Sequence, residues 1–183
     1  MTELLEDVLD ILNRCSIQHM VVGSVSSSLY GQARTTQDLD VVVQLDNYQL
    51  AELVKMLPES RYYVSSEAAR EAIRRRSQFN VIDLATGGKV DLMLLKGRPF
   101  SQMEFQRRRP TELLGRTISV ASVEDVILSK LEWNKITPSE RQIRDVLGIL
   151  SVQAEALDHA YLQHWAEQLG VDAKLKELLA VFE

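Results

Sequence analysis

The hydrophobic pattern changes once along the chain, near residues 121–123, and this change limits the folds open to it. Before it, short apolar β-branched runs alternate with segments whose apolar residues recur every three or four positions. After it, only the helical spacing continues. Strands mixed with helices, then helices alone, predict an α/β core at residues 1–121 and a helical C-terminal module at residues 122–183 that packs on the core.

Local patterns predict the individual elements of both parts. In the core, strands are predicted at 19–23, 38–44 and 116–122, and as a hairpin over 78–95 around Thr86-Gly87-Gly88. Helices are predicted at 1–14, 24–31, near 48–57, in the Arg-rich stretch before residue 77, and near 101–109. The module is predicted to hold helices at 123–134, 140–153, 158–170 and 171–182, with Trp133 and Trp165 on apolar stripes that face the core.

Composition excludes several protein classes. The 183 residues are 45% hydrophobic and 26% charged, as in soluble globular proteins. No stretch approaches the roughly twenty apolar residues that a membrane span needs, so no membrane association is expected. The N-terminus is acidic and amphipathic, unlike a leader peptide. A single cysteine, Cys15, excludes an internal disulfide, and we expect a cytoplasmic protein.

Charge is distributed unevenly along the chain. The net charge is −5, yet residues 61–116 carry 12 Lys and Arg against 6 Asp and Glu. A basic middle segment in an acidic protein favours an anion-binding face. The alternative is that these cations lie on solvated helix faces.

Two aspartates, Asp38 and Asp40, stand one residue apart at the start of an apolar run. Because residues i and i+2 of a strand point the same way, both carboxylates are expected on one face. Two such carboxylates repel each other unless a cation neutralises them, and Mg²⁺ commonly takes one or two carboxylates plus substrate phosphates. The alternative is that they are ordinary polar residues at a strand entry.

Three further stretches favour the metal hypothesis. Asp91 lies between Val90 and Leu92 in the second run of the hairpin, and it joins the same patch if that strand lies beside the first. Asp83, in the first run, is another strand acid and a rival for the third position. The Gly23–Ser24 turn follows a strand and precedes a helix, where free backbone N–H groups can hold a phosphate. Arg34, Thr35 and Thr36 lead into the acid pair and offer contacts to the same anion.

This ordered set resembles the nucleotidyltransferase superfamily related to DNA polymerase β. The signature of that superfamily is hG[GS], then [DE]h[DE], then h[DE]h, where h is a hydrophobic residue. The matching residues are Gly23–Ser24, Asp38–Asp40 and Val90–Leu92. The C-terminal half resembles the helical part of minimal nucleotidyltransferases and of the AbiEii toxin-like branch, and Lys130 and Asp145 match the lysine and aspartate of that region.

The resemblance implies a mixed sheet with flanking helices and a Mg²⁺-dependent transfer of a nucleoside monophosphate from an NTP to a hydroxyl group, with release of pyrophosphate. Mn²⁺ is an alternative metal. The implied metal ligands are Asp38, Asp40 and Asp91, which with Lys130 form the implied catalytic set. The implied nucleotide-binding residues are Gly23, Ser24, Arg34, Thr36, Lys130 and Asp145.

The acceptor stays open at this stage. Candidates are an RNA 3′ end, such as that of tRNA, a protein hydroxyl and a small molecule. Two alternatives to transfer also stay open. One is a nucleotide sensor that binds without turnover. The other is a toxin–antitoxin type protein whose helical module binds a cognate antitoxin or partner subunit. The sequence does not decide the oligomeric state.

Overall fold

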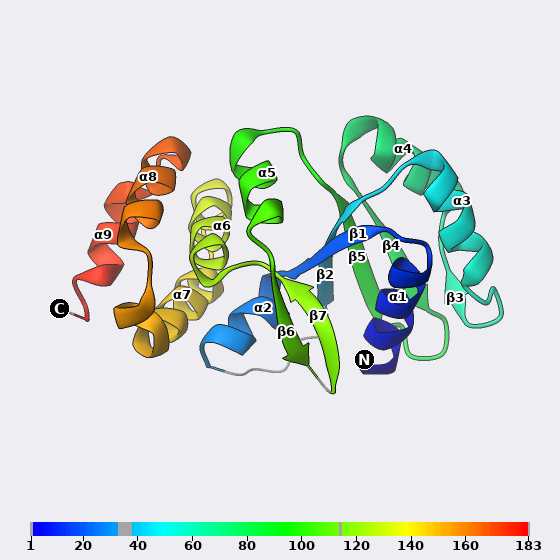
Figure 1. Ribbon diagram of the computed structural model, residues 1–183, viewed down its shortest axis with the longest axis horizontal. Helices are drawn as coiled ribbons and strands as arrows, with labels where there is room; N and C mark the ends of the chain where they lie inside the picture. Colours follow the sequence, from blue (N-terminus) through cyan, green and yellow to red (C-terminus); the bar gives the residue numbers. More distant parts are fainter. Residues whose placement is uncertain (1, 33–37, 114, 183) are drawn as a thin grey trace. The chain divides into compact units, whose positions relative to one another are not determined.

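The computed structural model describes residues 2–32, 38–113 and 115–182. The chain divides into two compact units: unit 1 is Met1–Val22 with Thr36–Val120, and unit 2 is Gly23–Thr35 with Ala121–Glu183 (Figure 1). The sequence pattern had assigned residues 23–35 to the core, whereas here they belong to the helical unit. The domain boundary at residue 121 stays a prediction.

Unit 1 is built on a mixed sheet, in agreement with the predicted α/β class. Within the described residues it has seven strands in the order β3-β4-β5-β2-β1-β7-β6. β2 runs parallel to β5 and β1 parallel to β7, and the other neighbours are antiparallel. The strands are β1 Gln18–Val22, β2 Asp38–Gln44, β3 Tyr62–Tyr63, β4 Gln78–Asp83, β5 Lys89–Leu94, β6 Arg109–Leu113 and β7 Arg116–Val120.

One face of the central strands is apolar and buried, because alternate residues point to it. The buried side chains of β2 and β5 on this face are Leu39, Val41, Val43, Val90, Leu92 and Leu94. Helix α1, Thr2–Arg14, packs on β1 and β5, and α4, Ser66–Arg75, packs on β4 and β5. α3, Asn47–Met56, contacts both helices. The opposite face of β2 and β5 carries the predicted acids Asp40 and Asp91.

Two strands of unit 1 were not predicted. β3 has only two residues, which is too short to show a pattern. β6 contains Pro110, and its apolar and polar residues hardly alternate. The helix predicted near 101–109 is α5, Pro99–Gln106, and it ends before the residues that form β6. Both unpredicted strands lie at the edges of the sheet, where a proline costs no ladder hydrogen bond.

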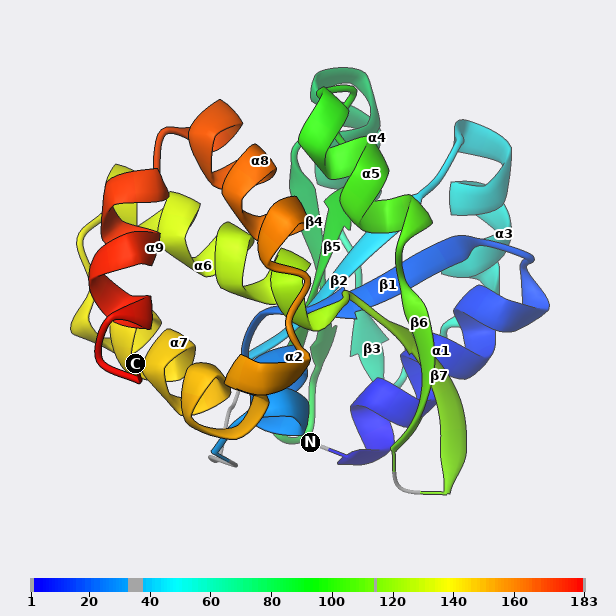
Figure 2. The same cartoon turned by 60° about the vertical axis from the view of Figure 1, so that its left-hand side comes forward.

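Unit 2 is helical, and Figure 2 brings α6 to α9 forward. Helices α6 and α7 pack together, α2 packs on both, α8 packs on α6, and α9 packs on α8. A β-carbon on Gly31, just after α2, would lie 2.8 Å from the backbone carbon of Gly148, so α7 approaches the chain closely there. The helices are α2 Gly23–Tyr30, α6 Val123–Ile136, α7 Glu140–Gln153, η1 Ala154–Ala156, α8 His159–Leu169 and α9 Asp172–Leu179.

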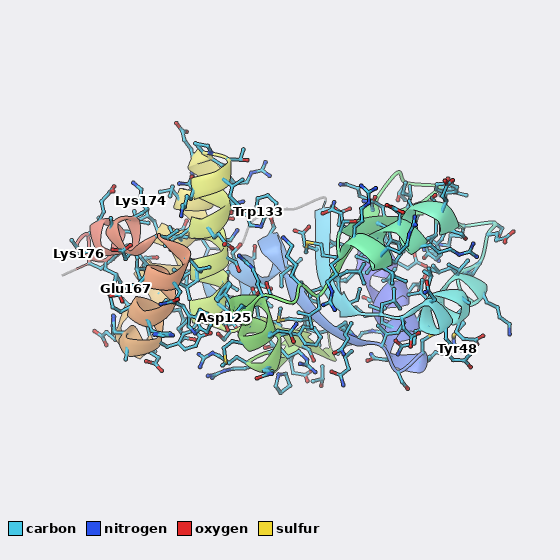
Figure 3. The ribbon with its side chains drawn as sticks, turned by 90° about the horizontal axis from the view of Figure 1, so that it is seen from above. Tyr48, Asp125, Trp133, Glu167, Lys174 and Lys176 are labelled. Carbon is cyan, nitrogen blue, oxygen red and sulfur yellow. The ribbon has the colours of Figure 1, made fainter. Side chains whose placement is uncertain are left out.

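The core position expected for Trp133 is wrong. This side chain, on α6 and labelled in Figure 3, is 54% exposed. It lies near the end of α6, where the apolar stripe continues into Ile136, which is also exposed. Among the helices that the structure describes, none combines the length and apolar character required to span a bilayer.

Candidate active site

The register of the sheet brings two of the predicted acids side by side in unit 1. Asp40 of β2 pairs with Asp91 of β5 in the parallel ladder, so their side chains leave the same face of adjacent strands. Strand alternation puts position 38 on the face of Asp40, and only the backbone of Asp38 is described. Arg34 and Thr36 lie outside the described residues.

Two further side chains of the sheet, those of Asn80 and Lys89, donate hydrogen bonds to Asp91. Asn80 of β4 pairs with Asp91 in the antiparallel ladder, and its Nδ2 donates a hydrogen bond to Asp91 Oδ1. Lys89 stands two residues before Asp91 on the same strand face, and its Nζ lies 3.1 Å from Oδ2 and 3.4 Å from Oδ1. Asp91 is buried, so these contacts fix the orientation of its carboxylate.

The rival acid Asp83 has a different role in the structure. It is buried at the end of β4 and accepts hydrogen bonds from the N–H groups of Ala85, at 2.8 Å, and Thr86, at 3.1 Å. Burial raises the pKa of Asp83, but these two hydrogen bonds and the nearby Arg61 outweigh it, so the pKa is lowered overall. Asp83 therefore stabilises the hairpin turn.

The Gly23–Ser24 turn lies in unit 2 and opens α2 directly after β1 ends at Val22. Gly23 has φ of 64°, a left-handed conformation that favours glycine and allows the abrupt change from strand to helix. One turn further along, the Ser27 hydroxyl donates to the Ser24 carbonyl at 3.1 Å. Such an N-terminus presents backbone N–H groups, which suit an anion.

The predicted pair Lys130 and Asp145 forms a buried salt bridge in unit 2. Lys130 Nζ of α6 lies 2.7 Å from Asp145 Oδ2 of α7, and both side chains are only 7% exposed. Lys130 also donates to Gln142 Oε1 at 3.2 Å, and the Ser27 hydroxyl of α2 donates to Asp145 Oδ2 at 3.4 Å. The cluster thus links three helices, including the one that starts at Gly23.

The donors in unit 1 suit a hard divalent cation. Two carboxylates on adjacent strands offer oxygen ligands, and Mg²⁺ prefers oxygen and commonly uses one or two carboxylates. Within the described side chains, no group of three or more His, Cys, Asp or Glu is placed to hold a metal, and the Asp38 carboxylate lies outside that set.

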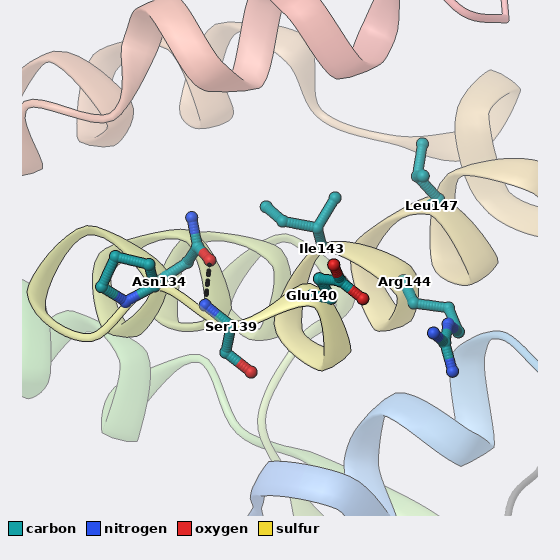
Figure 4. A pocket seen from close by; sticks show the side chains of 7 residues that line it. Asn134, Ser139, Glu140, Ile143, Arg144 and Leu147 are labelled. Atoms are coloured by element: carbon teal, nitrogen blue, oxygen red, sulfur yellow. Dashed lines mark hydrogen bonds between the residues drawn. The ribbon is translucent and has the colours of Figure 1, made fainter.

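A separate pocket of about 490 Å³ lies at the junction of α6 and α7 in unit 2 (Figure 4). The Asn134 side chain accepts a hydrogen bond from the Ser139 N–H at 2.9 Å beneath it. None of the residues of the resemblance lines this pocket, so it is not the predicted site. Its lining is Asn134, Pro138, Ser139, Glu140, Ile143, Arg144 and Leu147.

Sequence reasoning missed four polar residues of these clusters: Ser27, Asn80, Lys89 and Gln142. A signal existed for Lys89, because it is two residues from Asp91 and therefore shares its strand face. To predict that Asn80 lies beside Asp91, one must know the register of the hairpin, which depends on the exact length of its turn. Ser27 and Gln142 depend on how α2 and α7 pack on each other, and no local pattern shows this.

No protein-family model matches the sequence, and no curated protein is detectably similar to it. Solved structures are similar in fold. ANT(2″)-Ia, in complex with adenylyl-2″-tobramycin, has a TM-score of 0.62 and 10% identity, over 91% of this chain and 95% of that one.

Two further structures agree. The lincosamide antibiotic adenylyltransferase LnuA, bound to lincomycin, has a TM-score of 0.58 and 14% identity over 83% of this chain and 98% of its own. An antigenic nucleotidyltransferase-like protein from Paracoccidioides brasiliensis has a TM-score of 0.57 and 19% identity over 95% and 89%.

Proposed function

We propose that this chain, which has the fold of the nucleotidyltransferases, is a Mg²⁺-dependent enzyme that transfers a nucleoside monophosphate from an NTP to a hydroxyl group. The observation that carries the proposal is the in-register pairing of Asp40 with Asp91 on one face of the sheet. Two neighbouring carboxylates repel each other, and positive charge beyond that of Lys89 relieves the repulsion. A substrate-bound cation is a chemical reason to keep both.

The residues have distinct roles in this proposal. Asp38, Asp40 and Asp91 hold the metal, which when bound neutralises charge that develops on the phosphates. Asp91 also orients or deprotonates the attacking hydroxyl. The hydroxyl oxygen then forms a bond to the α-phosphorus, the bond from that phosphorus to the bridging oxygen breaks, and pyrophosphate leaves.

Residues of unit 2 are proposed to bind the nucleotide. Gly23 and Ser24 offer backbone N–H groups to phosphate, and Lys130 offers a positive charge against the triphosphate. In the structure, Asp145 forms an ion pair with Lys130 and neutralises this charge. Asp145 therefore reduces the attraction between Lys130 and a phosphate. Arg34 and Thr36 are also proposed to contact phosphate.

A small molecule with free hydroxyl groups is the proposed first class of acceptor, and ATP the first donor. The support is that the similar structure of ANT(2″)-Ia is a complex with adenylyl-2″-tobramycin, and that the similar LnuA is a lincosamide antibiotic adenylyltransferase. An RNA end and a protein hydroxyl are the other acceptor classes for the same assay. The basic segment 61–116 is the feature that favours an anionic acceptor.

The test is transfer of label from each α-labelled NTP with Mg²⁺, offered to a panel of aminoglycosides and lincosamides, to total RNA and to cell protein. The Asp38→Asn/Asp40→Asn variant is expected to lose transfer. Asp46→Asn is the matched control: Asp46 caps α3 by accepting from Gln49 N–H at 2.8 Å, and asparagine caps equally well. Binding of NTP without transfer to any acceptor contradicts the enzyme and favours a sensor.

A further inference from the structure

Lys89 forms an ion pair with Asp91, a carboxylate that the proposed metal would also bind. Its Nζ lies 3.1 Å from Asp91 Oδ2 and 3.4 Å from Oδ1, so one ammonium group faces both oxygens. The Asn80 amide donates to Oδ1 at the same time. Asp91 is thus already neutralised and hydrogen-bonded by residues of its own sheet.

Mg²⁺ and the Lys89 ammonium group compete for the oxygens of this carboxylate. A magnesium ligand oxygen lies about 2.0–2.1 Å from the metal, which brings the dication against a cation that is itself near both oxygens. Like charges at such a separation repel strongly in a partly desolvated site. For the metal to bind Asp91, the ammonium must leave it.

The two partners differ in their freedom to move. The Lys89 side chain is 41% exposed, and its four-carbon stem can turn the ammonium toward water. The Asp91 side chain is 11% exposed and is also held by Asn80. Exchange therefore moves the lysine and leaves the carboxylate in place.

We propose that Lys89 is an internal stand-in cation that competes with the divalent metal for Asp91. This inference rests on the proposed function, because it takes the metal to bind at Asp40 and Asp91. Lys89 reduces the negative charge of the acidic face while no metal is bound and lowers the affinity of that face for free metal. It is a positioning residue for Asp91 and has no step in the transfer reaction.

The test measures Mn²⁺ binding to the nucleotide-free protein from the loss of the free-ion signal in electron paramagnetic resonance. Lys89→Met is expected to tighten Mn²⁺ binding by roughly two- to fivefold, the size expected for a partly exposed charge pair. Lys89→Gln is the second variant if Lys89→Met fails to fold. Lys96→Met removes the same charge from an exposed position just after β5 and is expected to leave binding unchanged.

The variants separate this inference from the proposed function. Tighter binding in Lys89→Met, abolished by adding Asp40→Asn, supports the competition. Equal or weaker binding in Lys89→Met and Lys89→Gln, with Asp40→Asn still abolishing it, overturns the role of Lys89 and leaves the metal site intact. Absence of Mn²⁺ binding in the wild type and in every variant overturns the competition, while the transfer assay decides the proposed function separately.

Discussion

The buried salt bridge between Lys130 and Asp145 allows a stability role and a nucleotide role to be separated. Replacing Asp145 by Leu removes the carboxylate that lies 2.7 Å from the buried Lys130 ammonium and leaves the Gln142 oxygen at 3.2 Å. Removing one partner of a buried pair costs roughly 3–5 kcal/mol, because an uncompensated charge stays in the interior. With both side chains 7% exposed and 2.7 Å between Nζ and Oδ2, we expect about 3 kcal/mol or more.

The double variant Lys130→Met/Asp145→Leu is expected to behave differently. Apolar side chains of similar volume often replace a buried ion pair at little or no cost, so its stability should lie within about 1 kcal/mol of the wild type. If Lys130 meets the triphosphate as proposed, the same double variant should still lose transfer. A stable protein without activity is the expected combination.

Urea unfolding, followed by tryptophan fluorescence, measures these free energies of unfolding in the unit that contains the ion pair. The chain has two tryptophans, Trp133 on α6 and Trp165 on α8, and both belong to unit 2. Circular dichroism of the whole chain is the companion measurement. A cost below about 1 kcal/mol for Asp145→Leu refutes the view that this pair is held buried and desolvated.

Two further predictions concern packing and pH. Gly31→Ala puts a β-carbon 2.8 Å from the Gly148 backbone carbon, which must shift, and we expect a loss of about 1–3 kcal/mol in urea unfolding. No change would show that α2 and α7 can separate freely. For His19, burial and then Arg108 lower the pKa, against the hydrogen bond to Ile17, so the folded protein favours the neutral ring. Its contribution to stability is complete above the unfolded pKa of about 6.5 and is lost as pH falls toward the lower folded pKa, so unfolding free energies at pH 7.5 and 5 should differ less in His19→Gln.

The predicted elements with clear periodicity are present in the structure. The alternation in Asp38–Gln44 and the Thr-Gly-Gly turn specify β2 and the β4–β5 hairpin, because strand faces and tight turns are local properties. The same alternation put Asp38 and Asp40 on one face. That Asp91 stands directly beside Asp40 needed the parallel pairing of β2 with β5, which the sequence left as a condition.

Other features depend on contacts between distant segments. β6 has no apolar alternation, and it forms because β7 offers it an antiparallel partner. The sequence predicts that a helix ends at Gly31. Its small size is also required because α7, more than a hundred residues later, approaches it closely. The roles of the candidate site residues in metal and nucleotide binding remain predictions, since only their positions follow from the fold.

The make-up of unit 2 from two separate segments has a consequence for synthesis on the ribosome. α2, Gly23–Tyr30, emerges early, whereas α6 and α7, on which it packs, are made only after the strands of unit 1. Domains generally fold as units during translation, so the packing surface of α2 stays uncovered until α6 and α7 have been synthesised. A nascent chain halted before residue 121 would carry the proposed metal-binding acids but leave the Gly23–Ser24 turn attached to a helix without α6 and α7.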